Sequence, residues 1–193
     1  SRSLAAVWLL ACCSSPAWAQ ANAEPAPAES AADSPSLEDL EKRYAGTYVY
    51  AGTAAEQASI REDVYSATEG MVGKDIARKE IMKRSEIRPT YTISFDAKGM
   101  VKVETPGYPP EISPLDGTQV KLKTKYGDNV DNSQRFIDGA LVQRGKTHDG
   151  DGSTTFILLP DGKTLLVTRL SRSPKLPRPV VFSLTYVRQG ATP

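Results

Sequence analysis

The spacing of apolar residues changes from a helical period to a strand period near Pro89. Upstream of it, four apolar residues recur at helical spacing and would share one face of a helix: Ile60, Val64, Ala67 and Met71. Thr53, with Glu56 three residues later, is a capping-box pattern that predicts the start of this helix. A second helix is predicted over 74–87, and Pro89 ends it because the residue before a proline avoids helical angles.

A shorter helix is predicted at the start of the folded region. Ser36 can cap residues 37–45, and acidic residues in the first turn favour a helix there. The first strand is predicted directly after it, in the stretch GTYVY at 46–50. The two longer helices would therefore follow the first strand.

Beyond Pro89, apolar and polar residues alternate, which is typical of half-buried antiparallel strands. Tight-turn dipeptides separate the later strands: Gly127-Asp128, Asp138-Gly139, Asp149-Gly150 and Asp161-Gly162. Sequential hairpins without a long return connection favour a barrel over a sandwich. The sequence therefore predicts a mainly β fold, an antiparallel up-and-down β-barrel of about ten strands with two short helices after the first strand.

The residues before the barrel are expected to direct export. Residues 4–13 form an apolar run that is too short for a bilayer, which takes about 20 residues, but suits a secretory signal. Ala17 and Ala19 complete a cleavage pattern, so residues 1–19 are predicted to be a signal peptide. Residues 20–36 are rich in Ala and Pro and are predicted to be a disordered linker. Residues 37–190 are then the barrel domain.

A lipoprotein signal is the alternative interpretation of the same segment. Leu9-Leu10-Ala11-Cys12 resembles a bacterial lipobox, in which Cys12 would be lipidated and the signal would end before it. Both interpretations imply an exported bacterial protein, either periplasmic or secreted, or a lipoprotein of the outer or cell membrane. Both also leave the domain without cysteine, so no disulfide framework or cysteine-based metal site is expected.

The order of predicted elements resembles the calycins, and in particular their fatty-acid-binding-protein branch. The stretch LEDLEKRYAGTYVYAG is similar to the start of a lipocalin, where a short helix precedes Gly-x-Trp; here the motif reads Gly46-Thr47-Tyr48. The resemblance implies that Tyr48 closes the barrel floor beneath Arg188 of the last strand. A cation–π contact between them, worth about 0.5–2 kcal/mol, is expected.

The resemblance also implies a function, which is to bind a hydrophobic or amphipathic small molecule, such as a lipid, beneath the two helices. Fatty-acid binders hold the carboxylate with an Arg-x-Tyr pair on the last strand, but Leu184-Thr185-Tyr186 lacks the arginine. Strand alternation predicts five inward ligand-binding candidates: Phe95, Arg144, Phe156, Arg169 and Tyr186. The alternative function is a structural or protein-interaction barrel of the cell envelope without a ligand cavity.

Composition and candidate chemistry favour binding over catalysis. The formal net charge of +1 gives no reason to expect a nucleic-acid partner. The only histidine, His148, lies in a predicted hairpin tip, and carboxylates are sparse on the strands. The acidic turn at 149–151 lacks the closing glutamate of a calcium loop, and a hairpin between strands explains the acidic and amide residues at 128–132 equally well. No catalytic residue, cofactor or metal is expected, and residues 74–87 carry too many charges for membrane insertion.

Overall fold

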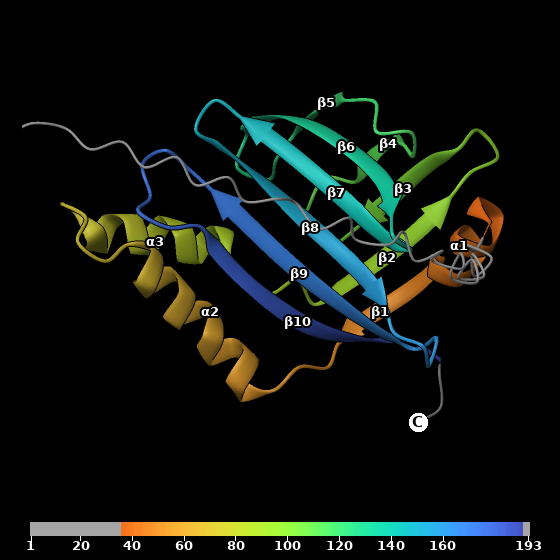
Figure 1. The fold of residues 1–193 in the computed structure, drawn as a ribbon, viewed down its shortest axis with the longest axis horizontal. Coiled ribbons are helices and arrows are strands. Elements are labelled where there is room, and N and C mark those ends of the chain that lie inside the picture. The colour runs from red at the N-terminus through yellow and green to blue at the C-terminus, as the bar shows by residue number, and fades with distance from the viewer. Residues whose placement is uncertain (1–35, 191–193) are drawn as a thin grey trace, which may run out of the picture. The chain divides into compact units, whose positions relative to one another are not determined.

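Within residues 36–190, which the computed structural model describes, ten antiparallel strands form one sheet that nearly closes into a barrel, and three helices accompany it (Figure 1). The strands are β1 (Gly46–Tyr50), β2 (Thr90–Phe95), β3 (Met100–Glu104), β4 (Glu111–Pro114), β5 (Val120–Lys123), β6 (Asn129–Ile137), β7 (Ala140–Thr147), β8 (Gly150–Leu158), β9 (Thr164–Arg172) and β10 (Val180–Arg188). The helices are α1 (Leu37–Tyr44), α2 (Ala54–Ala67) and α3 (Lys74–Arg84). The predicted barrel, with two short helices after the first strand, is confirmed.

The first strand pairs with the last, and this pairing joins the ten strands into one continuous sheet. β1 lies between β2 and β10, whereas the other neighbours in the sheet are consecutive in the chain. The edge strands β4 and β5 are not adjacent within the described sheet, and β6 bridges the gap between them. The Gln134 side-chain amide donates to the Glu111 carbonyl at 3.3 Å, and the Gly117 N–H donates to the Gln134 carbonyl at 3.1 Å.

Arg188 holds the floor of the barrel together. Its guanidinium carbon lies 5.0 Å from the centroid of the Tyr48 ring, and Nη2 donates to the Tyr48 hydroxyl at 2.6 Å. This is the contact expected from the sequence. The guanidinium also donates to the carbonyls of Arg43 and Ala45. A Cβ on Gly46 would lie 2.9 Å from Nη1 of Arg188, so the glycine of the Gly-x-Tyr motif leaves room for the guanidinium.

Large side chains fill the end of the barrel near α1. Tyr44 of α1 is buried there, and its hydroxyl donates to the Gly139 carbonyl at 2.8 Å and accepts from the Leu158 N–H at 3.0 Å. Other fully buried members of this core are Tyr48, Tyr91, Ile93, Leu141, Phe156, Leu165, Leu184 and Tyr186. This half of the lumen is therefore packed with side chains.

The predicted helix α2 packs against the barrel through the expected face. Ile60, Val64 and Ala67 are buried, and the helix contacts β10. Thr53 caps the helix as predicted, with its hydroxyl accepting from the Glu56 N–H at 3.4 Å. The Glu56 carboxylate instead accepts from the N–H and hydroxyl of Thr185 on β10, at 3.0 and 2.6 Å. Glu56 therefore fastens the start of α2 to the last strand.

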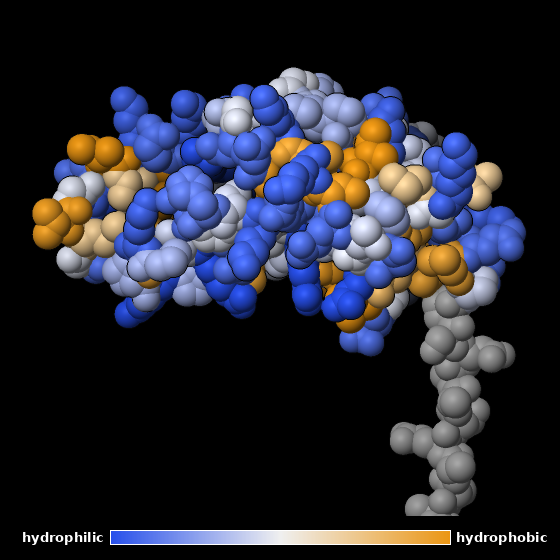
Figure 2. Space-filling view, turned by 90° about the horizontal axis from the view of Figure 1, so that it is seen from above, coloured by the Kyte–Doolittle hydropathy of each residue, from blue (hydrophilic) through white to orange (hydrophobic). Residues whose placement is uncertain are grey.

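Helix α3 uses only part of its apolar stripe for packing. Ile81 and Met82 pack against the core, whereas Ile76 is exposed, as is Val72 before the helix. Figure 2 shows hydrophobic residues at the end of the molecule where α3 lies, on a face that is otherwise mostly hydrophilic. Among the described residues, no helix is long and apolar enough to cross a membrane.

Near the edges of the sheet, two segments differ from the structure that their residue pattern predicts. The Pro-rich segment after β3 contains the short strand β4, although its sequence predicts a loop. The alternation of lysines and apolar residues continues to Tyr126, but β5 ends at Lys123 and the Thr124 hydroxyl accepts from the N–H groups of Tyr126 and Asp128 in a turn. The signal peptide predicted at 1–19, Cys12 and the linker before Ser36 lie outside the described residues.

Candidate functional site

Antiparallel register arranges the inward side chains of β6 to β10 in rows across the lumen. An apolar row fills the end near α1: Phe136, Leu141, Phe156, Val167 and Leu184. The next row, here called the polar row, contains Gln134, Gln143, Thr154, Arg169 and Phe182. The third, here called the open row, contains Asn132, Gly145, Gly152, Ser171 and Val180. The lumen thus changes from apolar to polar along the barrel.

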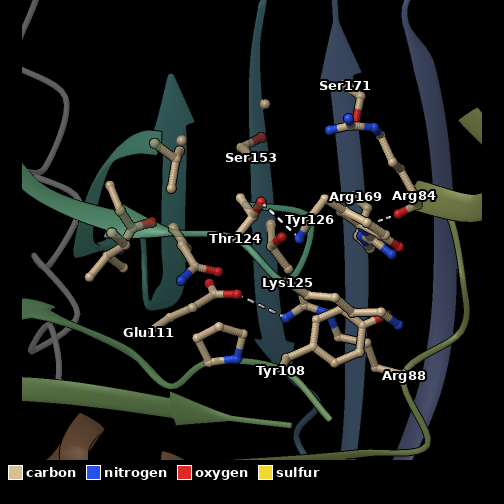
Figure 3. A pocket seen from close by; sticks show the side chains of 18 of the residues that line it. Arg84, Arg88, Tyr108, Glu111, Thr124, Lys125, Tyr126, Ser153, Arg169 and Ser171 are labelled. Carbon is tan, nitrogen blue, oxygen red and sulfur yellow. Dashed lines mark hydrogen bonds and ion pairs between the residues drawn. The ribbon is translucent and has the colours of Figure 1, made fainter. Parts of the chain in front are cut away.

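Residues of the polar and open rows line a pocket of about 240 Å³, here called the lumen pocket. The facing Gly145 and Gly152 leave part of its wall without side chains. The other walls come from the end of α3, the β3–β4 loop and the β5–β6 turn (Figure 3): Arg84, Arg88, Tyr108, Glu111, Lys125 and Tyr126. The volume is just below the roughly 300–1,000 Å³ that is typical of small-molecule sites.

Ion pairs surround the lumen pocket. Arg88 contacts Glu111 across it at 3.1 Å, and both side chains are largely buried (Figure 3). The Arg88 guanidinium also lies 4.7 Å from the ring centroid of Tyr108. Lys125 contacts Glu86 at 2.7 Å at the rim of the pocket. These pairs hold basic side chains at fixed positions around the cavity.

The end of helix α3 and the residues that follow it are fastened to the pocket rim. We call residues 83–88 the exit segment of α3. Arg169 donates from the polar row to the carbonyls of Arg84 and Glu86, at 3.0 and 3.2 Å. The Tyr126 hydroxyl donates to the Lys83 carbonyl at 2.7 Å, and the Arg84 guanidinium contacts Asp128 at 2.7 Å. The exit segment therefore closes one side of the pocket through side chains of β9 and of the β5–β6 turn.

The charges on this rim shift the pKa values of the groups that meet there. The hydrogen bond from Lys125 lowers the pKa of Glu86 below its ordinary value, and the hydrogen bond from Tyr108 adds to this effect. The same Glu86 hydrogen bond raises the pKa of Lys125. Burial raises the pKa of Tyr108 and, more strongly, that of Tyr186 in the core. At neutral pH the contact between Glu86 and Lys125 is therefore a charged pair.

Several buried polar atoms around the lumen pocket have no partner within the described part of the chain. They include Nε of Arg88 and the side-chain amide nitrogens of Asn132 and Gln143. Asn132 and Gln143 are only 3% and 5% exposed. Buried polar groups are hydrogen-bonded in the great majority of cases, so such a cluster beside a cavity marks a place where a bound molecule can supply partners.

The five ligand-binding candidates from the sequence have different locations. Arg169 lines the lumen pocket. Phe156 and Tyr186 face inward but are packed in the core, and Phe95 stacks on Phe136 with ring centroids 6.2 Å apart. The Tyr186 hydroxyl donates to the Arg88 carbonyl at 2.8 Å. The three aromatic candidates therefore belong to the packed part of the lumen, and Arg169 is the one candidate of the five that lines the pocket.

The inward orientation expected for Arg144 is wrong. Arg144 is exposed on the outer face of β7, because Leu141 and Gln143 are the inward residues of this strand. It lines a different hollow, of about 580 Å³, on the outer face of β6 to β9. That hollow is larger, but none of the unpartnered buried atoms of the described residues belongs to its lining. The lumen pocket is therefore the candidate site.

Comparison with solved structures relates the fold to that of fatty-acid-binding proteins. No protein-family model and no curated protein matches the sequence. Fatty-acid-binding protein 1 of Echinococcus granulosus is 14% identical, with 77% of this chain and 99% of that chain covered and a TM-score of 0.50. The chain shares its fold with fatty-acid-binding proteins.

Two other solved structures have a similar fold. A Schistosoma mansoni fatty acid binding protein in complex with arachidonic acid is 14% identical, with 78% of this chain and 99% of that chain covered and a TM-score of 0.50. The fluorescent protein UnaG is 16% identical, with 76% and 98% covered and a TM-score of 0.51. At such low identity the fatty-acid-binding-protein likeness is one of fold alone.

Sequence reasoning missed most of the residues that form the lumen pocket. Arg84, Arg88 and Lys125 lie near the ends of elements, where alternation says nothing about orientation. Gln143 breaks the apolar pattern of β7 at an inward position, and this was the available sign that the lumen is polar there. Inward placement of a polar residue in a strand is informative because its burial has a cost unless it is paired.

Proposed function

We propose that this protein is an exported carrier that binds a small amphipathic molecule in the lumen pocket. The observation that supports this proposal is the hollow in the polar half of the barrel, with unpartnered buried polar atoms in its wall. Apolar groups of Leu122, Val130 and Tyr126 line the same pocket. A ligand with both polar and apolar parts would match this wall. The proposal is of a binding protein and includes no catalytic step.

The shared fold supports an apolar part in the ligand, since the similar structures include proteins named for binding fatty acids. The size of the pocket limits that part. Side chains fill the other half of the lumen, and about 240 Å³ is left. A compact molecule fits this space better than a long acyl chain that is wholly enclosed.

Filling the pocket with a side chain tests the binding proposal. Thr154 lies in the polar row and lines the pocket, so Thr154→Phe places a ring in the cavity. Thr155→Phe is the matched control, because Thr155 pairs with Val142 on the outer face of the sheet. Binding of a neutral fluorescent probe, Nile red, is expected to fall at least about tenfold in Thr154→Phe, a loss of roughly 1.4 kcal/mol, and to stay unchanged in Thr155→Phe.

Native mass spectrometry of the protein purified from its own host provides a second test. A bound small molecule that is lost in Thr154→Phe is the expected result. A protein that emerges empty, and that binds the probe equally in both variants, would contradict the proposal. The alternative of a structural or protein-interaction barrel of the envelope would then be favoured.

Export is supported by the sequence pattern before the domain. The proposal expects the mature chain to begin at Gln20 after cleavage, or at a lipidated Cys12. The intact mass and cell fraction of the mature protein distinguish these two forms. An unprocessed chain in the cytoplasm would contradict export without affecting the binding proposal.

A further inference from the structure

The charge of the lumen pocket is strongly one-sided. Its lining contains five basic residues and one carboxylate, Glu111, among the described residues: Arg84, Arg88, Lys123, Lys125 and Arg169. Three of the basic residues have carboxylate partners, namely Asp128 for Arg84, Glu111 for Arg88 and Glu86 for Lys125. Positive charge therefore exceeds negative charge in the wall even after these pairs are formed.

Of the basic residues in the lining, Arg169 and Lys123 have no carboxylate partner within residues 36–190. The Arg169 guanidinium donates one hydrogen bond from each Nη to main-chain carbonyls of the exit segment, and its carbon lies 5.4 Å from the ring centroid of Phe182. A guanidinium has five N–H donors, so three remain for another acceptor. In the register, Arg169 pairs with Thr154, which pairs with Gln143, and all three line the pocket.

Three unpartnered buried atoms of the pocket lining are donors. The side-chain nitrogens of Asn132 and Gln143 and Nε of Arg88 are buried without a hydrogen-bond partner within the described chain. The terminal torsion of an amide side chain is soft, so a small rotation turns the NH₂ group of Gln143 or Asn132 toward the cavity. The wall therefore offers guanidinium and amide donors together, and this combination suits a negatively charged oxygen.

We infer that the ligand carries an anionic oxygen group, a carboxylate, phosphate or sulfate, which binds between Arg169, Arg88 and the amides of Gln143 and Asn132. This inference rests on the proposed function and specifies the ligand class of the same site. The location differs from the last-strand Arg-x-Tyr pair of the fatty-acid binders, because Tyr186 is buried in the core. The apolar remainder of the ligand would extend past Tyr126 and Leu122 toward the rim.

A matched pair of ligands tests this inference in the full-length protein. Isothermal titration calorimetry compares 4-phenylbutyrate with the neutral 4-phenylbutanol, and inorganic phosphate serves as a third arm without an apolar part. We expect the acid to bind roughly 10- to 100-fold more tightly than the alcohol, the range expected for hydrogen bonds to a charged group. Phosphate binding as strong as that of the acid would assign the site to a free oxyanion, and phosphate binding much weaker than the acid would assign it to an amphiphile.

Two variants and one control locate the effect. Arg169→Gln and the nearly isosteric Gln143→Glu are both expected to abolish the preference for the acid over the alcohol. Arg135→Gln is the control, because Arg135 is exposed on the outer face of β6. Gln143→Glu retains the links between Arg169 and the exit segment, so it stays informative if Arg169→Gln loosens that segment.

The outcomes separate this inference from the function on which it rests. Equal affinity for acid and alcohol, unchanged in both variants, would overturn the anionic ligand and leave small-molecule binding in place. Absence of binding for all three ligands and for Nile red would overturn both. Loss of acid preference in Arg135→Gln as well would show that the preference arises from overall charge, and would also overturn the site assigned here.

Discussion

Arg188 connects elements from both ends of the described chain at the floor of the barrel. It joins the last strand to the first through Tyr48, and to the helix before that strand through the carbonyls of Arg43 and Ala45. Gly46 makes the approach feasible, since any Cβ there would crowd the guanidinium. The Gly46-Thr47-Tyr48 motif and Arg188 therefore act as a unit, although 140 positions separate Tyr48 and Arg188 in the chain.

Removal of the Arg188 guanidinium is expected to destabilise the domain. Arg188→Leu leaves two carbonyls without their donor, and the loss of charged hydrogen bonds should lower the free energy of unfolding by about 1.5–3 kcal/mol. Urea denaturation monitored by far-ultraviolet circular dichroism measures this change. Arg144→Leu is the control, since Arg144 is exposed, and is expected to stay within about 0.5 kcal/mol of wild type. Equal stability of the two variants would refute the closing role of Arg188.

At the scale of elements, a small number of polar contacts add to the apolar packing that holds α2 and α3 on the barrel. Glu56 holds the start of α2 to Thr185 of β10. The exit segment of α3 is held by Arg169 from β9 and by Tyr126 and Lys125 from the β5–β6 turn. A few hydrogen bonds of this kind can open locally at a lower free energy than the core. We therefore expect the pocket to open at the contacts of the exit segment.

Acid should weaken the attachment of the exit segment. The folded-state pKa of Glu86 lies below its ordinary value of 4.5, so Glu86 stabilises the closed segment fully above that pH. The contribution is lost as the pH falls through the lowered pKa. Hydrogen exchange of residues 83–88 should therefore be slower in wild type than in Glu86→Gln near neutral pH, and the two should converge in acid. A difference between them that persists at low pH would contradict this role.

At the scale of the whole molecule, the sequence was sufficient to predict the barrel. Alternating strands with tight turns fixed the hairpins, and Asp138-Gly139 forms the expected turn with positive φ at both residues, 50° and 76°. The contact between Tyr48 and Arg188 was implied by the resemblance to the calycins, which rests on the element order and on the Gly46-Thr47-Tyr48 motif. These features depend on local spacing and on one motif, which a single sequence contains.

The interior was harder to predict because it depends on long-range register. The run Ala140-Leu141-Val142 is apolar on both faces of β7, so alternation alone could not decide whether Val142 or Leu141 faces inward. The opposite choice placed Arg144 inside and missed Gln143. The pocket also needs Arg84, Tyr108 and Lys125, which come from the end of α3, the β3–β4 loop and the β5–β6 turn. Only the folded arrangement shows that one half of the lumen is filled and the other is hollow.

A crystal structure of the full chain grown with 4-phenylbutyrate tests the central claim most directly. The account predicts electron density for the ligand inside the barrel, with its carboxylate beside Arg169 and Gln143 and its ring toward Leu122 and Tyr126. A lumen in which side chains occupy the whole space between the polar and open rows, with the ligand absent or bound only on the outer face, would contradict it.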